Sequence, residues 1–187
     1  MQAGIGIQQV NTFEDCRPSR KTKEFIIKPI PLEVVERTWK KISKMPLGES
    51  PKLINLMRKQ QSVVLAYLLA AGHKTLNQDE QELLLYMGIV VWQIMLQGSN
   101  PLIKATKSAL DEAEKANIKM LEYLEGEPEA DFIETSKKII SNYPQPEILR
   151  YVAEALTEET EEDSVITDEG KGIIMVYLKT VIDCFNR

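Results

Sequence analysis

The sequence contains very few of the residues that bind metals or form nucleophile–base pairs. Its 187 residues include one histidine, His73, and two cysteines, Cys16 and Cys184, which lie near opposite ends of the chain. This count is too small for Cys/His zinc sites, for haem attachment and for the di-iron sites that helical bundles often hold. Because the cysteines are not paired at short spacing, we expect two free thiols in a reducing compartment.

Sequence motifs that would identify a reaction are also missing. The stretch AGIGIQQ near the start has two glycines but no third glycine and no preceding strand, so it is not a phosphate-binding loop. The serines and threonines form no nucleophile elbow. We interpret His73, just past a predicted helix end, as a cation favoured by the helix dipole rather than as a catalytic group. The sequence therefore favours a non-enzymatic role and indicates no cofactor.

No apolar run is long enough to cross a bilayer. The longest, from Leu83 to Leu96, is interrupted by Gln93, and its fourteen residues span only about 21 Å, whereas about 20 residues and 30 Å are needed. A helix that is apolar on every side is typical of the centre of a helical bundle. The N-terminal residues lack a basic start followed by an apolar run. We therefore expect no signal peptide, no membrane partner and a cytoplasmic location.

Helical periodicity and capping residues predict an all-α fold. The sequence indicates a single-domain bundle of about seven helices over residues 31–187, with the apolar helix 83–96 at its centre. Residues 1–30 show no helical period, and we expect an extended, partly disordered basic arm. The predicted helices are 31–45, 51–71, 77–97, 101–126, 129–143, a short helix from 144–146 to Leu156, and a last helix capped by Thr167–Asp168.

Charge is distributed unevenly along the chain. Residues 1–60 hold twelve Lys and Arg against six Asp and Glu, a net +6, and the remainder has a net charge of −11. Within the basic part, one predicted helix face carries positive side chains at positions i, i+3, i+4 and i+7, which makes it the candidate partner-binding site. This basic face consists of Arg37, Lys40, Lys41 and Lys44.

Three interpretations of the basic face remain open. In the first, the face is solvated or packs against the acidic part of the chain. In the second, it binds an acidic protein, which includes a second copy of this chain. In the third, it binds nucleic acid. The pI of about 5.1 and the lack of interleaved surface aromatics count against nucleic acid.

Helix-borne carboxylates suggest an alternative function as an Mg²⁺-dependent all-α nucleotide hydrolase. The full acidic pattern of the all-α nucleotide pyrophosphatases is missing, however, and the same acids fit a helix start and a polar helix face. The candidates are Asp79 with Glu82, Asp111 with Glu112 and Glu114, and Glu122 with Glu125.

A small apolar ligand between the core helices is a further possibility. Met87, Met95, Tyr67 and Trp92 are candidate pocket residues, although core packing explains them equally well. Our leading hypothesis is a non-enzymatic intracellular helical module that acts, or regulates, through protein–protein contact and forms a homo-oligomer.

Overall fold

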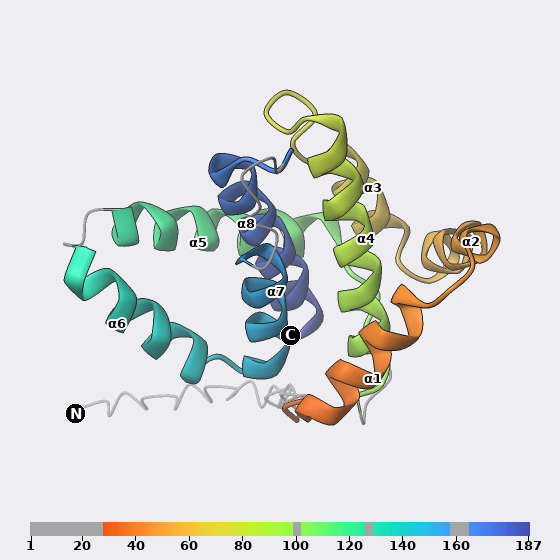
Figure 1. Ribbon diagram of the computed structural model, residues 1–187, viewed down its shortest axis with the longest axis horizontal. Helices are drawn as coiled ribbons and strands as arrows, with labels where there is room; N and C mark the ends of the chain where they lie inside the picture. Colours follow the sequence, from red (N-terminus) through yellow and green to blue (C-terminus); the bar gives the residue numbers. More distant parts are fainter. Residues whose placement is uncertain (1–27, 99–101, 126–128, 158–164) are drawn as a thin grey trace, which may run out of the picture.

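The computed structural model describes residues 28–98, 102–125, 129–157 and 165–187. These residues form eight α-helices and one short 3-10 helix, η1, and they contain no strand, which confirms the predicted all-α class. Figure 1 shows their arrangement. The elements are α1 (Leu32–Ser43), η1 (Leu47–Glu49), α2 (Ser50–Gln60), α3 (Ser62–Ala70), α4 (Gln78–Met95), α5 (Lys107–Glu125), α6 (Glu129–Ser141), α7 (Pro146–Thr157) and α8 (Asp168–Phe185).

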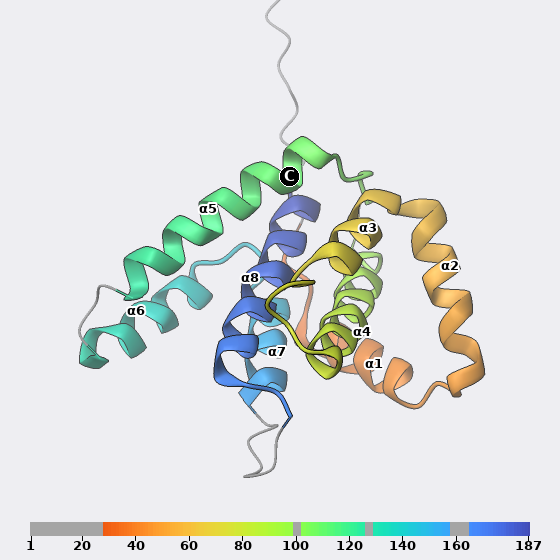
Figure 2. The same cartoon turned by 90° about the horizontal axis from the view of Figure 1, so that it is seen from above.

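The helices α4 and α8 lie side by side at the centre and run in the same direction (Figures 1 and 2). Helix α1 packs on α4 and α7, α3 packs on α4, and α5 packs along α8. Helix α6 contacts α5 and α7 on one side of the molecule, and α2 lies on the opposite side (Figure 2). The parallel pair at the centre is possible because three helices intervene between α4 and α8 in the sequence.

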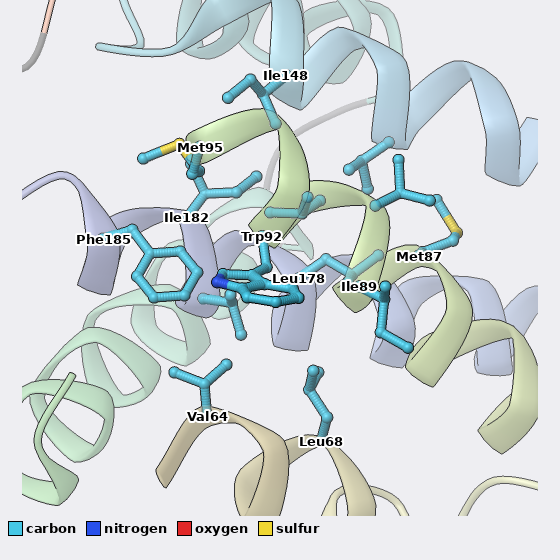
Figure 3. Packing of buried hydrophobic residues seen from close by; sticks show 14 of the residues in the cluster. Val64, Leu68, Met87, Ile89, Trp92, Met95, Ile148, Leu178, Ile182 and Phe185 are labelled. Carbon is cyan, nitrogen blue, oxygen red and sulfur yellow. The ribbon is translucent and has the colours of Figure 1, made fainter. Parts of the chain in front are cut away.

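The predicted central helix is observed as α4, and every residue of its C-terminal half, 87–95, is buried except Gln93. Trp92 is completely buried and packs between α8, from which Leu178, Ile182 and Phe185 approach, and α3, which contributes Val64 and Leu68 (Figure 3). The N-terminal half differs from the prediction, because Leu83 and Leu85 are half-buried and Tyr86 is exposed. Among the described helices, none combines the length and apolarity that crossing a bilayer would require.

Local capping chemistry determines where the two central helices begin. Asn77 forms a capping box at α4: its Oδ1 accepts from the Glu80 backbone N–H at 3.0 Å, and Glu80 Oε2 accepts from the Asn77 N–H at 2.8 Å. The Thr167 hydroxyl caps α8 by accepting from the Gly170 N–H at 2.9 Å. Gly72, with φ of +66°, follows α3 in the left-handed region that favours glycine. These helix boundaries agree with the predictions.

The predicted helix 51–71 is in fact two helices that meet at Gln61. This residue has φ −136° and ψ 54°, and its side chain is buried. Its Nε2 donates to the Ile103 carbonyl at 3.0 Å, and its Oε1 accepts from the Ala105 N–H at 2.9 Å. The same two bonds hold residues 102–106 out of helical geometry, so α5 begins at Lys107 and not near residue 101 as predicted.

The predicted arm, residues 1–30, lies almost entirely outside the described residues, which begin at Lys28. The part that is described joins the core. Ile30 is buried, and its N–H donates to Gln145 Oε1 at 2.9 Å. The Gln145 Nε2 donates to the Lys28 carbonyl at 3.3 Å and to Asn186 Oδ1 at 3.0 Å, so the chain enters the fold beside the C-terminal end of α8.

Candidate functional site

An exposed face of α4 forms the floor of an apolar groove. Asp79, Glu82, Leu83, Tyr86 and Ile89 recur at i, i+3, i+4, i+7 and i+10, so they lie along one side of the helix. The groove has a volume of about 740 Å³. We call it the α4 groove.

Three other segments form the walls of the α4 groove. The end of α1 and the turn after it contribute Ile42 and Met45, and α2 contributes Leu53 and Ile54. The segment that leads into α8 contributes Val165 and Ile166, and Val165 is 61% exposed. A volume of this size falls in the range of ligand-binding cavities. Because Val165 in the wall and Tyr86 in the floor are exposed, the groove is open to solvent.

A second, smaller hollow adjoins the groove and shares Leu83 and Tyr86 with it. This aromatic hollow has a volume of about 290 Å³ and is also lined by Trp39, Tyr151 and Glu154. The rings of Trp39 and Tyr151 are stacked, with centroids 6.3 Å apart and an interplanar angle of 21°. Burial raises the pKa of the Tyr86 and Tyr151 hydroxyls, so both tyrosines are neutral hydrogen-bonding groups at neutral pH.

Among the described residues, the charged side chains that line these two hollows are all acidic. Asp79 and Glu82 line the α4 groove and Glu154 lines the aromatic hollow, whereas no described Lys or Arg lines either one. Glu82 accepts a hydrogen bond from Gln78 Nε2 at 3.0 Å. Within the described part of the chain, no Lys or Arg side chain forms a salt bridge with these three carboxylates. The α4 groove therefore combines apolar contacts with two carboxylates, Asp79 and Glu82, that form no salt bridge among the described residues, whereas Glu154 shares an adjoining hollow with Lys40 and Arg150.

Glu80 holds the floor of the groove in place. Its side chain is only 2% exposed and lies between the N-termini of α4 and α8. Its Oε1 accepts from the Thr167 N–H at 2.9 Å and from the Thr167 hydroxyl at 2.7 Å. Burial alone would raise the pKa of the carboxyl, but the hydrogen bonds from Thr167 and Asn77 outweigh it and hold the pKa below its ordinary value. An ionised carboxylate is also favoured by two adjacent helix N-termini.

A buried polar cluster joins α5 to α8 away from the groove. Lys179 Nζ donates to Asn117 Oδ1 and to Asp183 Oδ2, each at 2.8 Å. The Tyr143 hydroxyl donates to the other Asp183 oxygen, and burial followed by this carboxylate raises the pKa of Tyr143 far above its usual range. Neither Lys179 nor Asp183 lines the α4 groove or the aromatic hollow. Because these groups satisfy one another, the cluster has a structural role.

The predicted basic face is exposed on α1. Arg37, Lys40, Lys41 and Lys44 all reach solvent. Lys40 forms a salt bridge with Glu36 at 2.7 Å and lies 5.7 Å from the Trp39 ring centroid. An exposed i,i+4 pair of this kind contributes only about 0.3–0.5 kcal/mol. Partner binding by this face remains a prediction.

The predicted carboxylate groups do not assemble into a metal site within the described residues, which contain no cluster of three or more His, Cys, Asp or Glu able to hold a metal ion. Glu112 forms a salt bridge with Arg187 at 2.9 Å, and that side chain holds the pKa of Glu112 below its usual value. Glu114 lies near the Tyr67 hydroxyl, Glu122 is exposed, and the Glu125 side chain lies outside the described residues. Asp79 and Glu82 border the α4 groove, and Asp111 borders a separate, mainly apolar cavity between α3 and α5.

The other candidate residues are separated in the fold. Met95 and Trp92 are buried in the core, and Met87 borders the aromatic hollow. Tyr67 packs edge-to-face on Tyr177, with ring centroids 5.4 Å apart. These residues therefore do not line a common pocket. His73 is exposed in the turn after α3. Cys184 is a buried free thiol whose pKa is raised by burial, and Cys16 lies outside the described residues.

The α4 groove was not predicted from the sequence. A signal was present, because Asp79, Glu82, Leu83 and Tyr86 follow helical spacing and mix acids with apolar residues on one face. Their exposure depends, however, on the position of α2, which the break at Gln61 determines. No protein-family model matches the chain, and comparison with curated proteins and with solved structures also finds no match.

Proposed function

We propose that this protein is a helical interaction module that binds a helix of a partner protein in the α4 groove. The observation that supports this proposal is the groove itself, an open cavity of about 740 Å³ bounded by α1, α2, α4 and the segment before α8. Exposed apolar surface bordered by polar residues is typical of protein-binding sites, and a helix laid in an apolar groove is a recurrent mode of recognition.

The side chains of the groove suit a protein partner better than a phosphate-bearing one. Tyr86 is 39% exposed at the point where the groove and the aromatic hollow meet, and tyrosine is enriched at interface hot spots. Asp79, Glu82 and Glu154 would repel the phosphates of a nucleotide or nucleic acid at this surface. Neither the hydrolase nor the nucleic-acid hypothesis therefore gains support from the groove.

Site-specific photo-crosslinking tests the proposal. A photoreactive amino acid at Ser43, which lines the groove, is expected to capture a partner from an extract of the source cells, whereas the same group at Ile118 on α5 is not. The captured protein is then purified and its affinity for the full chain is measured.

Two matched substitutions decide the outcome. Tyr86→Ser removes a central contact and is expected to weaken the purified partner's binding by about tenfold or more. Ile118→Ser, at a residue with similar exposure (44%) outside the groove, is expected to leave it unchanged. If Tyr86→Ser leaves the affinity of the purified partner unchanged, the proposal is overturned.

Self-association is the alternative use of the same surface. If a second copy of this chain occupies the groove, the wild type will sediment as a dimer and Tyr86→Ser as a monomer. Sedimentation velocity at low and high salt distinguishes the cases. A wild type that is monomeric at both salt concentrations removes the homo-oligomer and leaves a different protein as the partner.

A further inference from the structure

We infer that the partner segment is an amphipathic helix whose apolar stripe is bordered by Lys or Arg on the side that faces α4. This inference deepens the proposed function and depends on it. The floor of the groove from Asp79 to Ile89 covers about 15 Å at 1.5 Å per residue, so a partner helix of about 10–14 residues would fill it.

The arrangement of charge on the floor of the α4 groove determines which charge the partner helix must carry. Asp79 and Glu82 lie one helical turn apart on the exposed side of α4, and Glu154 lies beyond Tyr86 in the aromatic hollow. An acidic or phosphorylated helix laid in the α4 groove would bring like charges together, and no described Lys or Arg lines the groove to offset them. A basic helix would neutralise them.

The apolar part of the surface suits the same side chains. Lys and Arg have long aliphatic stems that can pack on Leu83 and Tyr86 while their charged ends reach Glu82 and Asp79. The aromatic hollow is different, because the chain's own Lys40 lies 5.7 Å from the Trp39 ring centroid, and both Lys40 and Arg150 line an adjoining hollow that includes Glu154. The preference for a basic partner therefore depends on Asp79 and Glu82 in the α4 groove.

The point at which the described chain begins is separated from the α4 groove by the length of α1. Lys28 is held by Gln145, which also bonds Asn186 near the end of α8. The α4 groove lies at the other end of α1, beside Ile42 and Met45. The residues before Lys28 are the alternative occupant that the crosslinking experiment below tests.

A displayed library of helical peptides tests the inference on the full chain. Each peptide carries a stripe of randomised apolar residues, and the flanking positions are an equal mixture of Lys, Gln and Glu. Binders are selected on the wild type after counter-selection on Tyr86→Ser. We expect the surviving sequences to be enriched in Lys on one flank.

The outcomes separate the inference from the proposed function. Groove-dependent binders with Gln or Glu at the flanks would overturn the inference while leaving the interaction module intact. A selection that yields no binder sensitive to Tyr86→Ser would count against both. Enrichment of Lys together with sensitivity to Tyr86→Ser supports both.

Charge substitutions give a second readout. The Asp79→Asn, Glu82→Gln double variant is expected to bind the selected Lys peptide about 3- to 10-fold more weakly, since two exposed ion pairs are lost. The Asp111→Asn, Glu122→Gln double variant, which removes two exposed carboxylates of α5, is the matched control and should have no effect. Equal weakening by both variants would mean that net charge, and not the groove, attracts the peptide.

Zero-length carbodiimide crosslinking tests the remaining occupants. In a mixture of isotopically light and heavy full-length chains, a crosslink from Glu82 to Lys21 or Lys23 within one copy would assign the groove to the chain's own N-terminal residues. The same crosslink between copies would assign it to a dimer. Either result would overturn a separate partner, whereas the inference predicts that neither crosslink forms and that the Lys peptide crosslinks to Glu82.

Discussion

At the scale of single residues, one buried carboxylate connects the N-termini of the two central helices. Glu80 accepts hydrogen bonds from Asn77 and from Thr167, so the first turns of α4 and α8 share one anion. Gly170 approaches this carboxylate so closely that a Cβ there would lie 2.1 Å from Glu80 Oε1. The packing leaves no room for a side chain at this position.

Gly170→Ala is therefore expected to lower the free energy of unfolding by about 1–3 kcal/mol, because Glu80 must move and lose hydrogen bonds. Gly172→Ala is the matched control. A Cβ at Gly172 would meet nothing within 4 Å, and alanine in place of glycine in a helix stabilises by up to about 1 kcal/mol. Urea denaturation of both variants measures the difference, and equal stabilities would show that the Glu80 contact is unimportant.

The lowered pKa of Glu80 predicts a specific acid response. A carboxyl whose folded pKa lies below its unfolded value contributes stability above the unfolded pKa, near 4.5, and loses that contribution as the pH falls through the folded pKa. Glu80→Gln should be less stable than the wild type at pH 7, by about 1–3 kcal/mol. The difference in the free energy of unfolding between the two proteins should become smaller below about pH 4.5. Urea denaturation midpoints of both proteins from pH 3 to 7 test this prediction. A difference between the two midpoints that does not change with pH would contradict it.

At the scale of secondary-structure elements, the helix starts that local caps determine could be predicted from sequence, whereas the break at Gln61 and the start of α5 could not. The caps at Asn77 and Thr167 are local, since each involves residues three positions apart. The end of α2 depends on Gln61, whose partners Ile103 and Ala105 are more than forty residues away. No local pattern around residue 61 contains that information.

Gln61→Ala is expected to destabilise the fold by about 1–3 kcal/mol, because the Ala105 N–H and the Ile103 carbonyl lose their side-chain partner. Hydrogen exchange at the Ala105 amide provides a local readout and should accelerate more than exchange in α8. Exchange that remains unchanged at Ala105 would show that the Gln61 side chain does not maintain the start of α5.

The contact between α3 and α4 depends on another glycine. A Cβ at Gly88 would lie 2.4 Å from Leu68 Cδ1, in a region where Leu68 is buried. Gly88→Ala should lower the free energy of unfolding by about 1–3 kcal/mol, because the added methyl group overpacks the contact. Part of the cost should be recovered when Leu68→Ala is added. A double-mutant cycle measures this coupling, and purely additive costs would mean that the two residues do not clash.

At the scale of the whole molecule, the fold class and the central helix were predictable because they depend on composition and periodicity. The α4 groove was not predictable, because Ile42, Leu53, Tyr86 and Val165 come from four separate segments that only the tertiary fold brings together. The position of these four segments also explains why only half of the apolar helix α4 is enclosed. The C-terminal part of α4 packs inside the bundle, and its N-terminal part forms an open surface lined with acidic residues.

Methyl NMR of the isoleucine-, leucine- and valine-labelled protein tests the central claim most directly. When the basic peptide selected on the full chain is added, the methyl groups of Ile42, Leu83 and Ile89 are expected to shift first and furthest. The methyl group of Ile118, on α5, should remain unchanged. Shifts centred on α5 or α6, or a titration that leaves the groove methyls unmoved, would contradict the account.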